Sequence, residues 1–229
     1  MQIWTEEFEL IIFDCDGVLV DSEPIINRAH AQVLTACGYS ITEEALIERF
    51  CGMSDPEMLD IIEREWGRAL PASYAARVGE MIESGFLRSL APMDGVAELL
   101  DALPLHRCVA SSSVPEQIRR KLELTGLLTF FGDKLFSATM VARGKPAPDL
   151  FLYAAEQLSA APSRCLVIED SAAGIDAANA AGMTAIGFSG GSHCGAEHAA
   201  RLQARGAKMV VANMRELAAA MPHCRRPPI

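Results

Sequence analysis

Positive charge is scarce in this sequence. Its 229 residues include 30 Asp and Glu but only 20 Lys and Arg, and the formal net charge is −10. A chain this acidic repels the phosphate backbone of nucleic acids, so we expect no nucleic-acid partner. Any anionic ligand must then be held by a metal ion or by a few well-placed cationic side chains.

Long apolar runs and paired cysteines are also missing. No stretch approaches the roughly 20 apolar residues that cross a bilayer, and no secretory signal is visible in residues 1–9. The seven cysteines are odd in number and form no CxxC pair. We therefore expect reduced thiols in a cytoplasmic protein without a membrane partner. The adjacent pair His193-Cys194 follows two glycines and is weak evidence for a metal site, so we interpret it as part of a loop.

Aromatic residues make up only 6% of the chain, whereas half of it is hydrophobic. This composition favours helices packed on a sheet over an all-β sandwich. Several short runs are apolar at every position, which indicates strands covered on both faces, as in a parallel sheet. These runs are 10–13, 108–110, 166–168, 184–188 and 209–211. Helical segments at 115–124, 147–158 and 172–181 separate them, which predicts a doubly wound, Rossmann-like α/β fold.

One region breaks the alternation of strands and helices. Between about residues 23 and 90 only helical patterns occur, at 24–37, 43–50, 58–66 and 72–90. Ser54 and Glu57 have the spacing of a capping box before the third of these helices. We predict an all-helical domain of residues 21–91, inserted into a core formed by residues 1–20 and 92–229.

Acidic residues gather where the predicted strands end. Asp14 and Asp16 follow the first strand, and Glu169 and Asp170 follow the run 166–168. In an open parallel sheet, ligands bind outside the carboxyl ends of the strands, where these side chains would meet. Four carboxylates at one edge repel one another, and a hard cation with oxygen ligands, such as Mg²⁺, offsets that repulsion. A simpler role for Asp170 alone is to cap the helix that follows it.

Two more residues fit this edge. Ser111 ends the second predicted strand, and Lys145 lies in a Gly-Lys-Pro loop before a helix. The Ser111 hydroxyl and the backbone N–H groups near Ser112, at the start of the helix from Pro115, suit phosphate oxygens. Lys145 is one of only four lysines. By itself it fits a solvated loop residue, but together with the acidic cluster it is a candidate to hold a nucleophile and a phosphate.

These residues stand in four motifs. The segment Phe-Asp-Cys-Asp-Gly-Val-Leu-Val-Asp-Ser at 13–22 resembles the first motif of the haloacid dehalogenase superfamily. Ser111, Lys145 and Glu169-Asp170 resemble the second, third and fourth motifs, in the family's order. The inserted helices resemble the mobile cap of the β-phosphoglucomutase-like subgroup.

The resemblance implies a magnesium-dependent phosphatase that acts on a small phosphorylated metabolite of the sugar or sugar-acid type. Asp14 would attack phosphorus and become an aspartyl phosphate, while Asp16 would act as acid and then as base. Mg²⁺ would be held by the Asp14 carboxylate, the Asp16 main-chain carbonyl and Asp170, with Glu169 as a ligand or a supporting residue. Lys145, together with Ser111, would stabilise the phosphoryl oxygens.

In the cap, the resemblance points to the loop that begins after Arg49. Gly52 matches the glycine of that loop, and Arg49 is a candidate to contact an anionic group of the substrate. Most other cap arginines fit solvated helix surfaces. The sequence does not determine the oligomeric state and is compatible with a monomer.

Other reactions of the superfamily fit less well. A phosphosugar mutase, the main alternative, calls for a His where 25–27 read Ile-Ile-Asn, for a cap Lys, and for an Arg where Asp55 stands. A phosphonate hydrolase also needs a cap Lys, and residues 21–91 contain none. A haloacid dehalogenase should lack Asp16. A non-catalytic protein that binds a phosphorylated ligand on the same fold is the alternative of another class.

Overall fold

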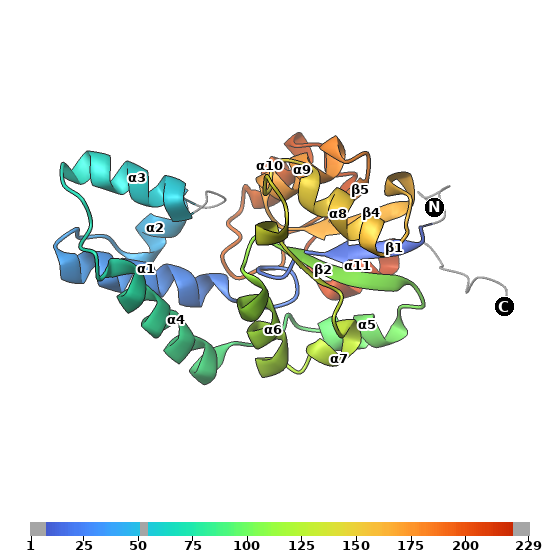
Figure 1. Cartoon of the computed structure of the whole chain (residues 1–229), viewed down its shortest axis with the longest axis horizontal. Coiled ribbons are helices and arrows are strands. Elements are labelled where there is room, and N and C mark those ends of the chain that lie inside the picture. The colour runs from blue at the N-terminus through green and yellow to red at the C-terminus, as the bar shows by residue number, and fades with distance from the viewer. Residues whose placement is uncertain (1–7, 51–54, 222–229) are drawn as a thin grey trace. The chain divides into compact units, whose positions relative to one another are not determined.

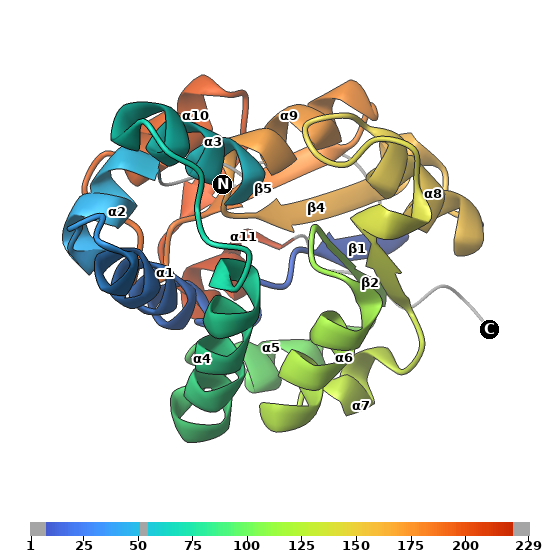
Figure 2. The ribbon, with the colours of Figure 1, turned by 60° about the vertical axis from the view of Figure 1, so that its left-hand side comes forward.

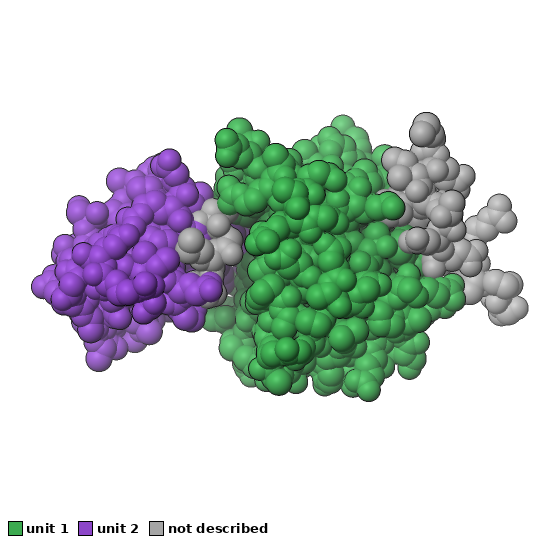
Figure 3. Space-filling view, turned by 90° about the horizontal axis from the view of Figure 1, so that it is seen from above, with its two compact units in different colours: residues 1–21, 91–229 green, residues 22–90 purple. Residues whose placement is uncertain are grey.

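The chain forms two compact units. The computed structural model describes residues 8–50 and 55–221. Ser22–Leu90 forms one unit, and the chain on either side, Met1–Asp21 with Ala91–Ile229, forms the other (Figure 3). The inserted unit is thus one residue shorter at each end than the predicted 21–91.

The larger unit is built on a parallel sheet of six strands in the order β3-β2-β1-β4-β5-β6. The strands are β1 (Leu10–Phe13), β2 (His106–Ser111), β3 (Leu135–Ser137), β4 (Cys165–Glu169), β5 (Thr184–Phe188) and β6 (Met209–Val211). This confirms the predicted doubly wound α/β fold. Strand β3 was not predicted, because three buried residues ending in Ser are too short for a recognisable apolar run.

Helices cover both faces of this sheet (Figures 1 and 2). On one face lie α8 (Asp149–Gln157), α9 (Ala172–Ala180) and α10 (His198–Ala204). On the other lie α5 (Val96–Ala102), α6 (Pro115–Leu124), α7 (Leu128–Phe131) and α11 (Met214–Ala220). Strand β1 is buried on both sides, because Ile12 packs in a cluster with Leu150 and Ile175, whereas the Phe13 ring meets Phe131 at 6.1 Å. Its uniform apolar run reflects these two contacts.

The described residues of the smaller unit form four helices around their own apolar core. They are α1 (Glu23–Cys37), α2 (Glu43–Phe50), α3 (Asp55–Trp66) and α4 (Tyr74–Ser89). Leu34, Leu46 and Ile62 are fully or almost fully buried in this core. Gly38 ends α1 in the left-handed conformation, with φ of 99°, which a glycine adopts without strain. Ser54 of the predicted capping box lies outside the described residues.

The start of α9 corrects one expectation. Ser171, not Asp170, is the N-cap residue, and its Oγ accepts a hydrogen bond of 3.0 Å from the Gly174 N–H. The Asp170 carboxylate instead lies against His193, whose Nε2 is 3.1 Å from Asp170 Oδ2. Asp170 is therefore not the helix cap, and its side chain belongs to the edge of the sheet.

Candidate active site

The turn after β1 brings the first carboxylate to the edge of the sheet. The Asp14 N–H donates to the Ile168 carbonyl of β4 at 2.9 Å, and the β1–β4 register places Asp14 opposite Glu169. Gly17 then turns the chain with φ of 73°. A Cβ at Gly17 would lie 1.7 Å from Asp170 Oδ2, so only glycine lets this turn approach that carboxylate.

Lys145 joins two of the carboxylates. Its Nζ lies 2.7 Å from Asp14 Oδ1, 2.7 Å from Glu169 Oε2 and 3.1 Å from the Ala110 carbonyl. The other Glu169 oxygen, Oε1, accepts hydrogen bonds from the N–H and the hydroxyl of Ser171. Both oxygens of Glu169 are thus engaged, and this residue fixes the ammonium group beside Asp14.

Burial and charge set the proton affinity of these groups. Burial, the neighbouring charges of Glu169 and Asp16, and a smaller opposing effect of Lys145 together raise the pKa of Asp14 from 3.8 to about 7. Burial by itself would lower the pKa of Lys145, but Asp14 and Glu169 reverse this and raise it. Lys145 therefore stays protonated, whereas burial makes the charged form of Asp14 less favourable.

A buried lysine that was not among the predicted site residues, Lys121, holds Asp16. Lys121 Nζ lies 2.5 Å from each oxygen of the Asp16 carboxylate and 2.9 Å from Ser113 Oγ. The Ser113 hydroxyl donates to Asp16 Oδ2 at 3.0 Å, and Ser111 Oγ lies 3.5 Å from the same oxygen. Asp16 is therefore fixed by one ion pair and supported by two hydroxyl groups.

The position of Lys121 in its helix could have revealed it. On α6, the buried residues are Ile118, Lys121 and Leu122, which share one face of the helix. Lys121 is only 2% exposed. A lysine in the apolar stripe of a helix needs a buried anion, because an unpaired buried charge is strongly destabilising.

The other predicted site residues of the larger unit are two serines at the end of β2 and a cluster of carboxylates. Ser111 is buried at the end of β2, and Ser112 beside it is exposed. Carboxylate oxygens of Asp14, Glu169 and Asp170 lie within 4.8 Å of one another and all three residues are buried, so they are candidates to hold a metal ion.

The cap candidate Arg49 is engaged within its own unit. Its Nη2 lies 2.8 and 2.6 Å from the two Glu65 carboxylate oxygens, and its Nη1 donates to the Tyr39 hydroxyl at 3.1 Å. The guanidinium also lies over the Phe50 ring at 4.7 Å. Gly52 lies outside the described residues. Among the helices of residues 8–50 and 55–221, none is both long and apolar enough to span a bilayer.

Comparisons with known proteins identify the family of this chain. A family model described as haloacid dehalogenase-like hydrolase matches residues 8–182. The chain is 32% identical over 190 residues to the 6-phosphogluconate phosphatase of Escherichia coli, covering 81% of this chain and 84% of the relative.

Two solved structures are similar to this chain over most of its length. One is a conserved haloacid dehalogenase-like protein of unknown function from Agrobacterium tumefaciens, with 41% identity, a TM-score of 0.85, and coverage of 93% of this chain and 96% of that one. The other is a haloacid dehalogenase family hydrolase from Deinococcus radiodurans with bound phosphate and sodium. It has 33% identity, a TM-score of 0.76, and coverage of 93% and 94%.

Proposed function

The chain belongs to the haloacid dehalogenase-like hydrolases, and on that premise we propose that it is a magnesium-dependent phosphatase. Its substrate is a small phosphorylated metabolite of the sugar or sugar-acid type, and the reaction passes through an aspartyl phosphate on Asp14. The observation that carries this proposal is the contact of Lys145, whose side chain is only 4% exposed, with the Asp14 carboxylate at 2.7 Å. The named phosphatase relative and the neighbour with bound phosphate support the substrate class.

In the first half-reaction an Asp14 oxygen adds to phosphorus while the bond from phosphorus to the ester oxygen breaks. Asp16 delivers a proton to that departing oxygen. In the second half-reaction Asp16 takes a proton from a water molecule, which attacks phosphorus and releases inorganic phosphate and the Asp14 carboxylate. Lys121 holds both Asp16 oxygens, so it positions this carboxyl group for both steps.

Lys145 and Ser111 act on the phosphoryl group. Lys145 fixes Asp14 through Oδ1, and its positive charge offsets the negative charge of the nucleophile and of the incoming phosphate. Ser111 is buried at the carboxyl end of β2, where its hydroxyl and the neighbouring N–H of Ser112 suit a phosphoryl oxygen.

The residues present fit a magnesium ion. The buried Asp14, Glu169 and Asp170 offer hard oxygen ligands, and the single positive charge of Lys145 does not balance three carboxylates. Asp14, Asp170 and the main-chain carbonyl of Asp16 would hold the ion, while Glu169 supports Lys145. When bound, the ion would supply positive charge to the phosphoryl oxygens as charge develops on them.

A matched pair of variants tests the nucleophile. Asp14→Asn should reduce phosphate release from a generic aryl phosphate by at least about 10²–10³-fold, the usual cost of losing one essential group. Asp94, which is exposed, provides the control Asp94→Asn with unchanged turnover. Chelation should stop the wild-type reaction and Mg²⁺ should restore it. Equal turnover of the Asp14 variant would refute the assignment.

The same assay separates the alternatives. A non-catalytic binding protein would bind a phosphorylated ligand with no phosphate release from any metabolite of a broad panel. A mutase would interconvert phosphosugar isomers without net release of phosphate. Release of phosphate at a rate that depends on Asp14 is expected only of the hydrolase.

We place substrate selection in the helical unit Ser22–Leu90 and test it at Arg49. If the guanidinium contacts substrate, Arg49→Ala should raise KM for the true substrate more than for an aryl phosphate. Glu65→Gln is the control, because it weakens the ion pair of 2.6 Å but leaves the guanidinium in place. An equal rise of KM in both variants would show that Arg49 only stabilises the unit.

A further inference from the structure

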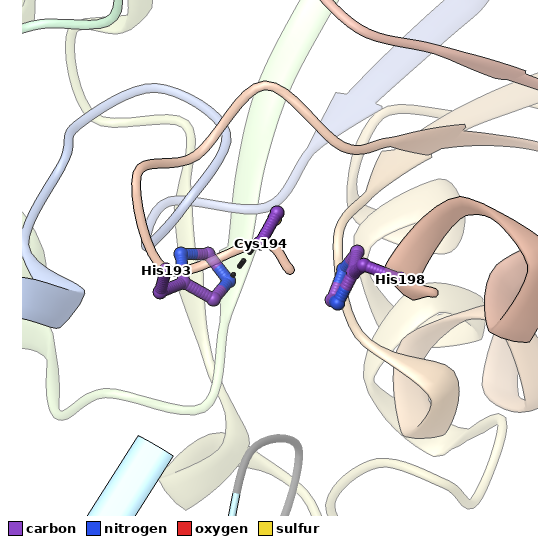
Figure 4. Close-up of side chains that lie close together, drawn as sticks. All are labelled: His193, Cys194 and His198. Carbon is purple, nitrogen blue, oxygen red and sulfur yellow. Dashed lines mark hydrogen bonds between the residues drawn. The ribbon is translucent and has the colours of Figure 1, made fainter. Parts of the chain in front are cut away.

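The loop after β5 holds a cluster of nitrogen and sulfur donors that the proposed reaction does not use. His193 and Cys194 lie in this loop, and His198 begins α10. One ring nitrogen of each histidine and the Cys194 sulfur all lie within 4.8 Å of one another. The two imidazole rings meet edge to face, with centroids 5.6 Å apart, and Figure 4 shows His193 and Cys194 on one loop facing His198. The adjacent His-Cys pair of the sequence thus gains a third donor from the fold.

The hydrogen bond of His198 decides which of its nitrogens can bind a ligand. His198 Nε2 lies 2.6 Å from the Asp170 main-chain carbonyl, and a carbonyl oxygen can only accept, so Nε2 carries the proton. The other nitrogen, Nδ1, is buried and has no hydrogen-bond partner among the described residues. A histidine that donates one N–H to a carbonyl and keeps the other nitrogen for a ligand is the usual arrangement of a metal-binding imidazole.

The distances suit a small tetrahedral ion. His193 Nε2 lies 3.5 Å from Cys194 Sγ and 3.1 Å from Asp170 Oδ2. Zinc bonds of about 2.3 Å to sulfur and about 2.0–2.1 Å to nitrogen or oxygen, at tetrahedral angles, separate such ligand atoms by about 3.3–3.6 Å. Small shifts would therefore bring these three atoms onto one ion.

Packing already fixes the central ring. His193 is only 9% exposed. A Cβ at Gly191 would lie 2.6 Å from the ring carbon Cε1 of His193, and a Cβ at Gly17 would lie 2.9 Å from the same atom. The ring is held between two stretches of glycine backbone, so binding a metal would cost little ordering of this side chain. Cys194 is half-buried, which leaves the thiol an approach from solvent.

We propose that His193, Cys194 and His198 form a second metal site, for a thiophilic divalent ion of the Zn²⁺ class, with Asp170 in reach as a fourth ligand. Thiolate and imidazole donors select Zn²⁺ or Co²⁺ over Mg²⁺, which prefers oxygen. Binding replaces the thiol proton by a metal–sulfur bond and releases that proton to solvent. The site differs from the oxygen cluster at Asp14, although both involve Asp170.

Cobalt spectroscopy of the full chain tests this site without an activity assay. Reduced protein is titrated with Co²⁺ in excess Mg²⁺, and thiolate-to-cobalt absorption in the near ultraviolet is recorded. We expect one equivalent of Co²⁺ to produce this band. Cys194→Ser should abolish it, and Cys37→Ser, at another half-buried cysteine, should retain it. His198→Gln should weaken Zn²⁺ binding by more than about tenfold, since even partners of metal ligands contribute that much.

Two results would overturn the proposal. One is a folded wild-type protein without the thiolate band, and the other is a band that survives Cys194→Ser. The Asp14→Asn variant should keep the band, so failure of the second site and failure of the proposed phosphatase are distinguishable.

A consequence for turnover rests on the proposed function. An ion bound to Asp170 beside His193 would withdraw that carboxylate from magnesium, so micromolar Zn²⁺ should inhibit wild-type phosphate release at saturating Mg²⁺. Cys194→Ser should resist this inhibition, and equal sensitivity of the variant and the wild type would place the inhibitory zinc elsewhere.

Discussion

The proposed nucleophile should destabilise the metal-free protein. The pKa of Asp14 rises from 3.8 to about 7 on folding, chiefly because the group is buried. A carboxyl group with a raised pKa in the folded state favours folding only while it is protonated. Its contribution is complete below pH 3.8 and is lost as the pH rises to about 7. Asp14→Asn, which cannot ionise, should therefore stabilise the protein at high pH.

The shift of pKa gives the size of the effect. A change of about three units at about 1.4 kcal/mol per unit corresponds to up to about 4 kcal/mol at pH 8. At pH 5 the same relation gives less than half of this effect, because the unfolded carboxyl group is ionised there while the folded one is still protonated. For a chain of this length, the gain at pH 8 corresponds to roughly 8–16 °C in Tm.

Urea unfolding in the presence of a chelator measures this difference. Wild type and Asp14→Asn are compared at pH 5 and pH 8 by circular dichroism, with Asp94→Asn as the exposed control. Added Mg²⁺ should raise the stability of the wild type far more than that of the Asn variant, because a ligand stabilises the state that binds it. A variant that is no more stable than the wild type at pH 8, or a gain that does not depend on pH, would refute the reasoning.

Two more substitutions probe the supports of the site. Lys121→Met should lower kcat by roughly 10–100-fold with little change in KM, because Asp16 loses the cation that fixes both its oxygens. The control Lys134→Met, at an exposed lysine, should leave kcat unchanged. An unaltered kcat in Lys121→Met would show that Lys121 does not position Asp16. Gly174→Ala should destabilise the protein by about 1–3 kcal/mol, because a Cβ there would lie 2.0 Å from the glutamate side chain that ends β4. Gly79→Ala, in open space on α4, should stabilise the protein by about 0.5–1 kcal/mol. Thermal unfolding measures both changes, and a higher Tm for Gly174→Ala than for Gly79→Ala would contradict this steric explanation.

Much of the core could be predicted from the sequence, because its signals are local. The run 10–13 is apolar at every position, which marks a strand buried on both faces, and Asp14 follows it directly. The helices 43–50 and 115–124 begin and end where their patterns do. The short strand Leu135–Ser137 and the seven-residue helices α5, α10 and α11 are too brief to show a period.

Local signals were ambiguous where two neighbouring residues had the same preference. Asp170 and Ser171 are both favourable N-cap residues, and the sequence does not rank them. The fold distinguishes them, because the Asp170 carboxylate lies against His193, whereas Ser171 caps α9.

The sequence by itself determined which side chains end the strands of the sheet, since chain order and uniformly apolar runs place Asp14, Ser111 and Glu169 there. Only the tertiary structure decided which distant charges meet. Lys121 reaches Asp16 across 105 residues, and His193 reaches Asp170 from the loop after β5. Periodicity records which face of a helix or strand is buried, but it carries no information about the partner on the other side. That choice depends on how the layers pack, and packing is a property of the whole chain.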